Sequence, residues 1–313
     1  MENSRGKSKG LSWGLWLGLC VLGGVSVYYY PLFVLTMFVL PALWATLAFR
    51  THPLMLVVAG MLVFCFGGFM GYGLMSCLCV LAMAAPGGSF LWYSQKERMG
   101  NFQSVMYMSV LLTFGLFVLF CVPDLLLSGD PYASIRTYFA GNVEMFAGTA
   151  LYATAVDMVS HIGEVMVACF FAFAGIYALV NVLVLHALNG AKKDMPLCPL
   201  GPFGTWCASF PYMAVTGILG LIATAVTVTA DSPAASTLSL LLYEMWALPL
   251  LMTGANYLYA MLCRRLPLGR ARLIFGVTLG VGLLFSAQIA QVALLLLGLV
   301  GVIRRRRAGK ERR

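Results

Sequence analysis

The stretch over residues 165–188 contains no Asp, Glu, Lys or Arg. A helix needs about 20 apolar residues to cross the hydrocarbon core of a bilayer, and this stretch is long enough. Similar stretches recur along the chain, in which 61% of the residues are hydrophobic and only 10% are charged. Soluble domains carry about 25% charged residues. The sequence therefore predicts that lipid is the solvent for most of the chain.

Apolar stretches separated by charged or Pro-containing turns predict an all-α, polytopic transmembrane helix bundle with about eight to ten spans. The expected spans cover residues 11–29, 32–49, 54–70, 73–93, 104–122, 165–188, 212–230, 238–263 and 273–302. Pro86-Gly87-Gly88 is expected to break the fourth span near its end. Residues 123–134 are expected to form a loop. The last stretch is too long for one ordinary span, so we divide it near Ser286-Ala287-Gln288 into two short helices, with one long tilted helix as the alternative.

The whole chain, residues 1–313, is expected to form one integral membrane domain. Its expected parts are an N-terminal span group over 11–188, a cytoplasmic Pro/Trp connector over 189–211, a C-terminal span group over 212–303 and a basic tail over 304–313. Within the first group, residues 131–163 interleave polar and aromatic residues, which is typical of an amphipathic helix. We expect this segment to lie outside the cell at the membrane surface.

The distribution of basic residues predicts the topology. If the N-terminus is cytoplasmic and ten spans alternate, every Lys and Arg except Arg136 falls on the cytoplasmic side. This is a strong positive-inside signal, and it predicts an inner (plasma) membrane protein with both termini in the cytoplasm. The net charge of +9 does not indicate nucleic acid, because the basic residues flank apolar stretches. There they set topology, and the basic tail can also contact anionic lipid.

The chain lacks the common nucleotide-binding and zinc-protease motifs. It has no Walker lysine motif, no G-x-G-x-x-G that opens a helix and no H-E-x-x-H. Its nine cysteines include no C-x-x-C pair and lie mostly in apolar stretches, as buried small residues do. We therefore expect neither an enzyme nor a cofactor.

Asp157, His161 and Glu164 are spaced four and three residues apart, so on one helix they would share a face. Two carboxylates and an imidazole are weak candidates for a metal site or a proton relay. The alternative is that they form the wet face of an amphipathic helix.

Three polar residues inside expected spans are candidates for substrate binding: Glu244, Asn181 and Asn256. A carboxylate within a span is costly, which makes Glu244 a functional candidate unless it lies at the membrane interface. The two asparagines, like His186, could line a cavity or donate hydrogen bonds to a neighbouring helix.

The connector holds the candidate partner-binding set Pro202, Phe203, Trp206 and Pro211. Aromatic residues next to prolines could dock a partner. They could equally serve as an interfacial anchor, since Trp and Phe lie favourably at head-group depth.

The chain resembles the YybS-like family of bacterial multi-pass membrane proteins of unknown function. The similar features are Asn181-Val-Leu-Val-Leu at the end of a span, a short basic turn, Pro202-Phe203-x-x-Trp206-x-x-x-x-Pro211, and Leu297-Gly298-Leu299 before the arginines that begin at Arg304. The family's layout looks distantly like that of the substrate-binding membrane subunits of energy-coupling-factor transporters. That resemblance implies a solute-binding subunit that relies on separate ATPase and coupling subunits.

We therefore predict a solute-binding or transport component without its own ATPase. The alternative is a non-transporting membrane scaffold or partner-binding protein. A transporter is expected to have a polar cavity between its spans near Glu244 and Asn181.

Overall fold

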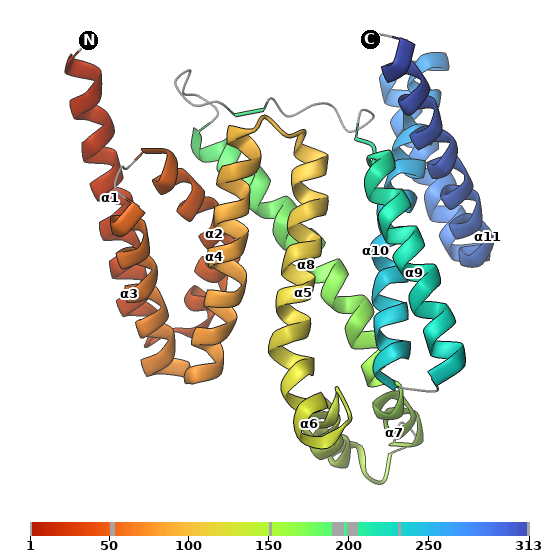
Figure 1. Cartoon of the computed structure of the whole chain (residues 1–313), viewed down its shortest axis with the longest axis horizontal. Helices are drawn as coiled ribbons and strands as arrows, with labels where there is room; N and C mark the ends of the chain where they lie inside the picture. The colour runs from red at the N-terminus through yellow and green to blue at the C-terminus, as the bar shows by residue number, and fades with distance from the viewer. Residues whose placement is uncertain are drawn as a thin grey trace. The chain divides into compact units, whose positions relative to one another are not determined.

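The computed structural model describes residues 2–50, 54–149, 152–189, 197–198, 206–230 and 233–311. All regular structure in these residues is helical, which confirms the predicted all-α class (Figure 1). The chain divides into two compact units, Met1–Pro199 and Leu200–Arg313. The division falls within the predicted connector.

Unit 1 holds a succession of helices joined by short turns. They are α1 (Glu2–Ser26), α2 (Tyr30–Arg50), α3 (Leu54–Tyr72), α4 (Leu74–Lys96), α5 (Asn101–Ser128), α6 (Ala133–Val143), the 3₁₀ turn η1 (Glu144–Phe146), α7 (Tyr152–Ser160) and α8 (Ile162–Asn189). The α1 and α3 helices run parallel and touch closely, because a Cβ added at Gly67 would overlap the backbone of Gly23. Phe33 and Phe64 stack in the buried core beside them, with ring centroids 5.3 Å apart.

The α4 helix continues through Pro86-Gly87-Gly88, so the predicted break is wrong. Gly88 lies against the side chain of Trp44, and a Cβ at this position would come within 2.7 Å of it. The small residues that suggested a break instead let α2 approach α4. Tertiary packing therefore overrides the local tendency of the Pro-Gly-Gly sequence to end a helix.

The α5 helix also continues past its proline, Pro123, and ends at Ser128. Gly129 follows in the left-handed conformation, with φ of 73°, which is the usual way for a helix to end. The predicted loop over 123–134 is therefore wrong for its first part. This places Asp124 in the last turns of a long helix.

Unit 2 contains α9 (Phe210–Ala230), α10 (Pro233–Arg265) and α11 (Leu268–Glu311). The residues of α11 are helical throughout, yet the chain doubles back. A Cβ at Gly282 would lie 3.2 Å from the Cβ of Ala290, whereas eight residues of straight helix rise about 12 Å. Figure 1 shows the two limbs of α11. This confirms the predicted reversal near Ser286-Ala287-Gln288.

The two limbs of α11 pack against α10 in opposite directions. In the first limb, Phe275 contacts Tyr259 at a centroid distance of 5.3 Å, eight residues on either side of the turn at Pro267. In the second limb, Gly298 touches the backbone of Leu250 and Gly301 touches Thr253, so this limb runs parallel to α10.

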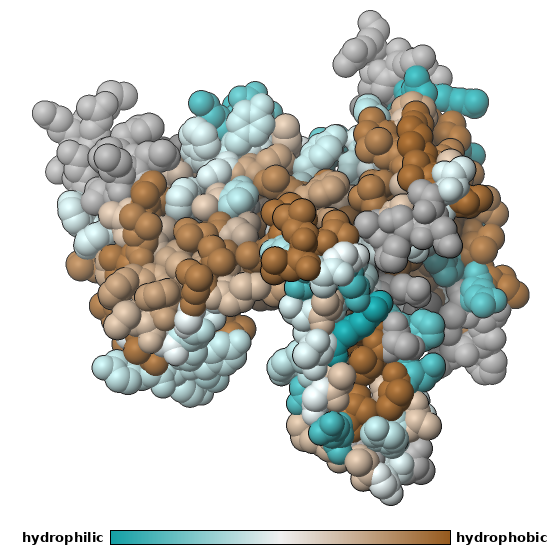
Figure 2. Space-filling model, turned by 60° about the horizontal axis from the view of Figure 1, so that its bottom comes forward, coloured by the Kyte–Doolittle hydropathy of each residue, from teal (hydrophilic) through white to brown (hydrophobic). Residues whose placement is uncertain are grey.

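Seven helices in the described residues are long and apolar enough to cross a membrane. They lie in α2, α4, α5, α8, α9, α10 and the second limb of α11. Shorter apolar segments, Trp13–Ser26 and Val57–Tyr72, lie in α1 and α3. Hydrophobic side chains cover much of the visible surface, as a multi-pass membrane protein requires (Figure 2).

Candidate ligand groove in unit 1

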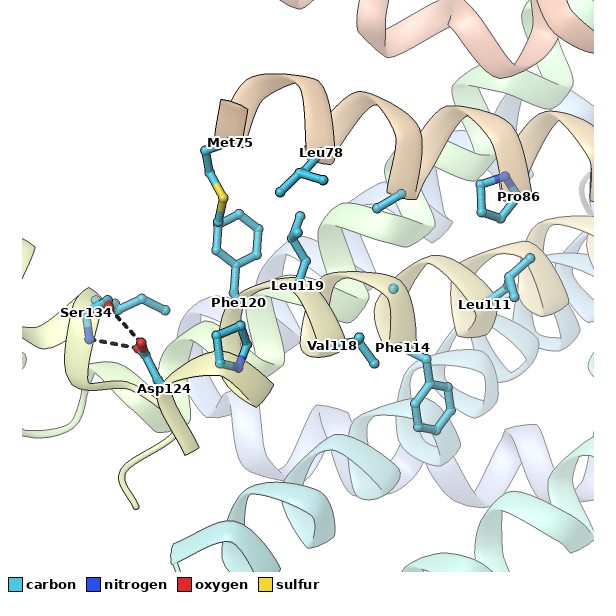
Figure 3. A pocket seen from close by; sticks show the side chains of 14 residues that line it. Met75, Leu78, Pro86, Leu111, Phe114, Val118, Leu119, Phe120, Asp124 and Ser134 are labelled. Carbon is cyan, nitrogen blue, oxygen red and sulfur yellow. Dashed lines mark hydrogen bonds between the residues drawn. The ribbon is translucent and has the colours of Figure 1, made fainter. Parts of the chain in front are cut away.

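An apolar groove of about 700 Å³ lies between α4 and α5 in unit 1 (Figure 3). Its lining residues are Met75, Leu78, Ala82 and Pro86 from α4, Leu111, Phe114, Gly115, Val118, Leu119, Phe120, Pro123 and Asp124 from α5, and Ser134 and Ile135 from α6. Both helices belong to the set that can cross a membrane. The groove therefore runs along two spans.

Small residues bring the two helices together at the floor of the groove. A Cβ at Gly115 would lie 3.4 Å from the carbonyl oxygen of Ala82. Larger side chains around this contact, among them Phe114 and Val118, are 41% and 58% exposed. The close approach of small residues and the projection of large ones produce an apolar hollow that other apolar atoms can fill.

The end of the groove carries its hydrogen-bonding groups. The Ser134 backbone N–H donates to Asp124 Oδ2 at 2.8 Å, and the Ser134 hydroxyl donates to Asp124 Oδ1 at 2.6 Å (Figure 3). Ser134 is the second residue of α6, where a backbone N–H has no partner within the helix. Asp124 thus supplies the negative group that a helix N-terminus favours. A carboxylate has about four lone-pair sites, so it can accept further donors from a ligand.

A second cavity of about 270 Å³ adjoins the groove. The two share Met75, Phe120, Ser134 and Ile135. The second is completed by Tyr138, Phe139, Met166 and Phe170 from α6 and α8. The two apolar spaces therefore meet at the end of the groove that Ser134 lines.

Asn181 does not line the groove, and its side chain forms hydrogen bonds with the backbone of α2. Its side-chain amide donates to Phe38 O at 2.9 Å, and its Oδ1 accepts from Ala42 N at 2.9 Å. In a regular helix these two groups bond to each other, but Pro41 lies between them and disturbs that turn. Asn181 is 0% exposed, so the structure shows the second of its two predicted roles, a hydrogen bond to a neighbouring helix.

Tyr177 satisfies the other group that Pro41 leaves without a donor. Proline has no N–H, so the carbonyl of Met37, four residues earlier, loses its helical partner. The Tyr177 hydroxyl donates to this oxygen at 2.7 Å. One turn of α8 therefore supplies every donor and acceptor that the proline removes from α2.

Gln95, Asn101 and His186 form a polar cluster where α4 ends, α5 begins and α8 ends. Asn101 Oδ1 lies 3.1 Å from His186 Nε2. Gln95 accepts from the Cys198 N–H at 3.0 Å, and Asn101 donates to the Cys198 carbonyl at 3.3 Å. Two side-chain amides thus hold the backbone N–H and C=O of one residue of the predicted connector.

In unit 2, Asn256 holds the other described part of the connector. Its amide donates to Trp206 O at 2.8 Å, and the Thr253 hydroxyl accepts from Ala208 N at 3.0 Å. Asn256 is 1% exposed, and its Oδ1 has no hydrogen-bond partner among the described residues. Glu244 lies in α10, partly exposed. Neither Glu244 nor Asn181 lines the groove or the cavity beside it, and both of these spaces are apolar, so the polar cavity expected near these two residues is not found there.

The remaining predicted partner-binding residues divide between described and undescribed segments. Pro211 is exposed in the first turn of α9, and Trp206 is partly buried just before that helix. Pro202 and Phe203 lie outside the described residues.

Asp157, His161 and Glu164 do not share one continuous helix, so that expectation is wrong. The α7 helix ends at Ser160 and α8 begins at Ile162, with His161 in the turn between them. Asp157 and His161 lie 4.0 Å apart with side chains 77% and 63% exposed. The described residues contain no group of three or more His, Cys, Asp or Glu that could hold a metal ion, and the Glu164 side chain is not among them.

Asp124 and Ser134 were not predicted as site residues. Asp124 comes just after an expected apolar span, and a residue in that position is also typical of a loop. No protein-family model, curated protein or solved structure matches this chain. The resemblance to YybS-like proteins therefore stays a prediction.

Proposed function

We propose that this chain is a multi-pass inner-membrane protein that binds a hydrophobic solute, as a transport component without its own ATPase. The observation that carries the proposal is the groove between α4 and α5, with its apolar walls and its Asp124–Ser134 end. The ligand that fits has an apolar chain and a head that donates hydrogen bonds, such as a long-chain alcohol or amine.

The use of polar groups in the helix interior supports an apolar solute. The Asn181 and Tyr177 side chains donate hydrogen bonds to α2, and the His186 ring contacts Asn101. The groove instead presents apolar side chains and a single acidic group. A polar solute would lose its hydration there without gaining partners, whereas each buried methylene contributes about 0.8 kcal/mol.

The arrangement of helix ends in unit 1 supports the proposed topology of ten spans with cytoplasmic termini. Asn189 bonds Thr46 and His186 bonds Asn101, so the end of α8, the end of α2 and the start of α5 lie together. This end carries Arg50, Lys96 and Arg98. Arg136 lies on α6 at the opposite ends of α5 and α8, where it pairs with Asp130 at 2.8 Å. Basic residues concentrate on the cytoplasmic side of membrane proteins.

Separate ATPase or coupling subunits would supply the energy for transport, since the chain has no nucleotide motif. The alternative function is a membrane scaffold. It is supported by the connector, which unit 1 holds at Cys198 and unit 2 holds at Trp206.

A binding titration with a fluorescent long-chain primary alcohol tests the groove. Val118→Trp should fill part of the groove and weaken binding of the alcohol about tenfold. This loss of affinity corresponds to fewer than two methylenes of the ligand that are no longer buried. Ile176→Trp is the matched control, because Ile176 on α8 has the same 58% exposure and does not line the groove. Equal weakening by both substitutions, or by neither, would overturn the proposal.

A second variant tests the polar end. Asp124→Asn keeps an acceptor for the α6 N-terminus but removes the carboxylate charge. The wild-type chain should prefer the alcohol to the fatty acid of the same length, because two carboxylates repel, and Asp124→Asn should lose this preference. An unchanged preference would exclude Asp124 from the ligand site.

A further inference from the structure

The second limb of α11 carries four consecutive arginines near its end, Arg304–Arg307, which we call the arginine cluster. Arg304 donates to the Tyr257 hydroxyl at 2.6 Å, and its guanidinium lies 5.8 Å from the centre of that ring. Arg306 lies 3.8 Å above the centre of the Phe210 ring. Arg304 therefore contacts α10 and Arg306 contacts the start of α9, so the cluster is held against both of these helices of its own unit.

Arg305, between them, interacts with the thiol of Cys207 in the segment before α9. Each contact comes from a different part of unit 2, since successive residues of a helix point about 100° apart. The cluster thus has fixed positions. A flexible basic tail would lose more side-chain entropy on binding an anion than this arrangement does.

The positive charge at this end of unit 2 is large. Arg264 and Arg265 end α10, Arg270 and Arg272 lie at the start of α11, and all four are exposed, as is the arginine cluster. Among the described residues of unit 2, no carboxylate lies within 4.0 Å of the guanidinium groups of Arg304 or Arg306. Such a surface attracts an anion.

Stacking leaves the edges of a guanidinium available. The Arg306 guanidinium carbon lies 3.8 Å from the centre of the Phe210 ring, and a guanidinium that rests on a ring can still bond two oxygens of one phosphate through its N–H groups, a geometry that lysine does not offer. Just before the cluster, two apolar side chains are exposed, Val300 at 42% and Ile303 at 45%, while Gly301 and Val302 between them are buried. The surface therefore changes from apolar to basic within one turn, as at the boundary between acyl chains and head groups.

We propose that the arginine cluster of unit 2 binds the phosphate of an anionic phospholipid, with Arg304 and Arg306 as its principal ligands. The apolar surface that precedes the cluster favours a lipid over a soluble polyanion. Tyr257 and Phe210 position the two guanidinium groups. This inference does not depend on the groove in unit 1.

The test uses the full chain in nanodiscs of phosphatidylcholine with a minor fraction of phosphatidylglycerol. The measurement is the enrichment of phosphatidylglycerol in the lipid that stays bound after extraction, determined by mass spectrometry. Arg306→Gln should lower the enrichment about fivefold, as expected for one charge near the surface. Arg306→Lys keeps the charge and should still lower it about threefold, the equivalent of one exposed cation–π contact. The matched control is Arg272→Lys, which should change nothing.

Equal enrichment in Arg306→Lys, Arg272→Lys and the wild type would overturn the assignment of the cluster. Inorganic phosphate and a short single-stranded RNA are added separately as competitors. Displacement of phosphatidylglycerol by RNA at equal phosphate concentration would also overturn the proposal, because it would make the surface a nucleic-acid site. Retention of the lipid against both competitors supports it.

Discussion

Replacing Asn181 with leucine is expected to lower the free energy of unfolding by about 2–4 kcal/mol. The change keeps the number and branching of the side-chain heavy atoms but removes the partners of Ala42 N–H and Phe38 C=O on α2. A buried group without a partner costs about 1–3 kcal/mol. Hydrogen bonds between membrane helices average nearer 0.6 kcal/mol and reach about 1.7, because the unfolded chain in lipid also finds partners. Two groups at about 1–2 kcal/mol each give the stated range.

Pro41 is the origin of this cost, since it leaves Ala42 and Phe38 without each other as partners, and a second variant background tests its role. In Pro41→Ala the proline ring no longer disturbs this turn of α2, so Ala42 N–H can donate to Phe38 C=O without Asn181. Asn181→Leu should then cost less than about 1 kcal/mol. The assay is a reversible titration with sodium dodecyl sulfate in mixed micelles, followed by circular dichroism. An equal loss of stability in both backgrounds would refute the account of Asn181 as the substitute partner for the proline turn.

Two further predictions concern packing and titration. Gly88→Ala should lower the unfolding free energy by about 1–3 kcal/mol in the same titration, because its Cβ would lie 2.7 Å from Trp44. Gly14→Ala is the control and should have no such cost, because the space beside Gly14 is open. Equal effects of the two substitutions would contradict the packing of Gly88 against Trp44. Burial raises the pKa of the Cys207 thiol and Arg305 lowers it, so Arg305→Leu should raise this pKa further and slow alkylation at pH 8. Site-resolved mass spectrometry of alkylated peptides measures the rate, and faster alkylation in Arg305→Leu would contradict the role of Arg305.

Hydropathy predicts which segments are helices because lipid leaves the backbone no other partner. The stretch over 165–188 lies within α8, and the stretch over 104–122 lies within α5. The reversal in the last stretch was also predictable from the sequence, because its length and the arginines after it favour a chain that returns to the side from which the stretch began.

The groove could not be predicted from the sequence. In a membrane protein, the residues that line a groove and those that face the bilayer are equally apolar. The sequence therefore does not distinguish Val118, which lines the groove, from Ile176, which does not. Only the packing of α4 on α5 separates them. The sequence does not indicate Asp124 as a site residue, because Pro123 predicts a loop at this point. In the structure, α5 continues past Pro123, which neighbouring helices allow.

Asn181 shows the same limit at a single residue. A polar side chain in a span indicates either a ligand or a helix partner, and the sequence left both open. The choice depends on Pro41, which is distant in sequence and reaches Asn181 only through the packing of α2 on α8. The pairing of a proline in one span with an asparagine in another is visible only once the helices are placed.

Photo-crosslinking with a diazirine-bearing long-chain alcohol tests the groove most directly. The full chain in detergent or nanodiscs is irradiated with the probe, and modified peptides are mapped by mass spectrometry. The proposed function predicts that modification concentrates on residues 75–86 of α4 and 111–124 of α5 and falls in Val118→Trp but not in Ile176→Trp. Modification spread evenly over the exposed apolar faces of α8 and α9, unchanged by Val118→Trp, would contradict it.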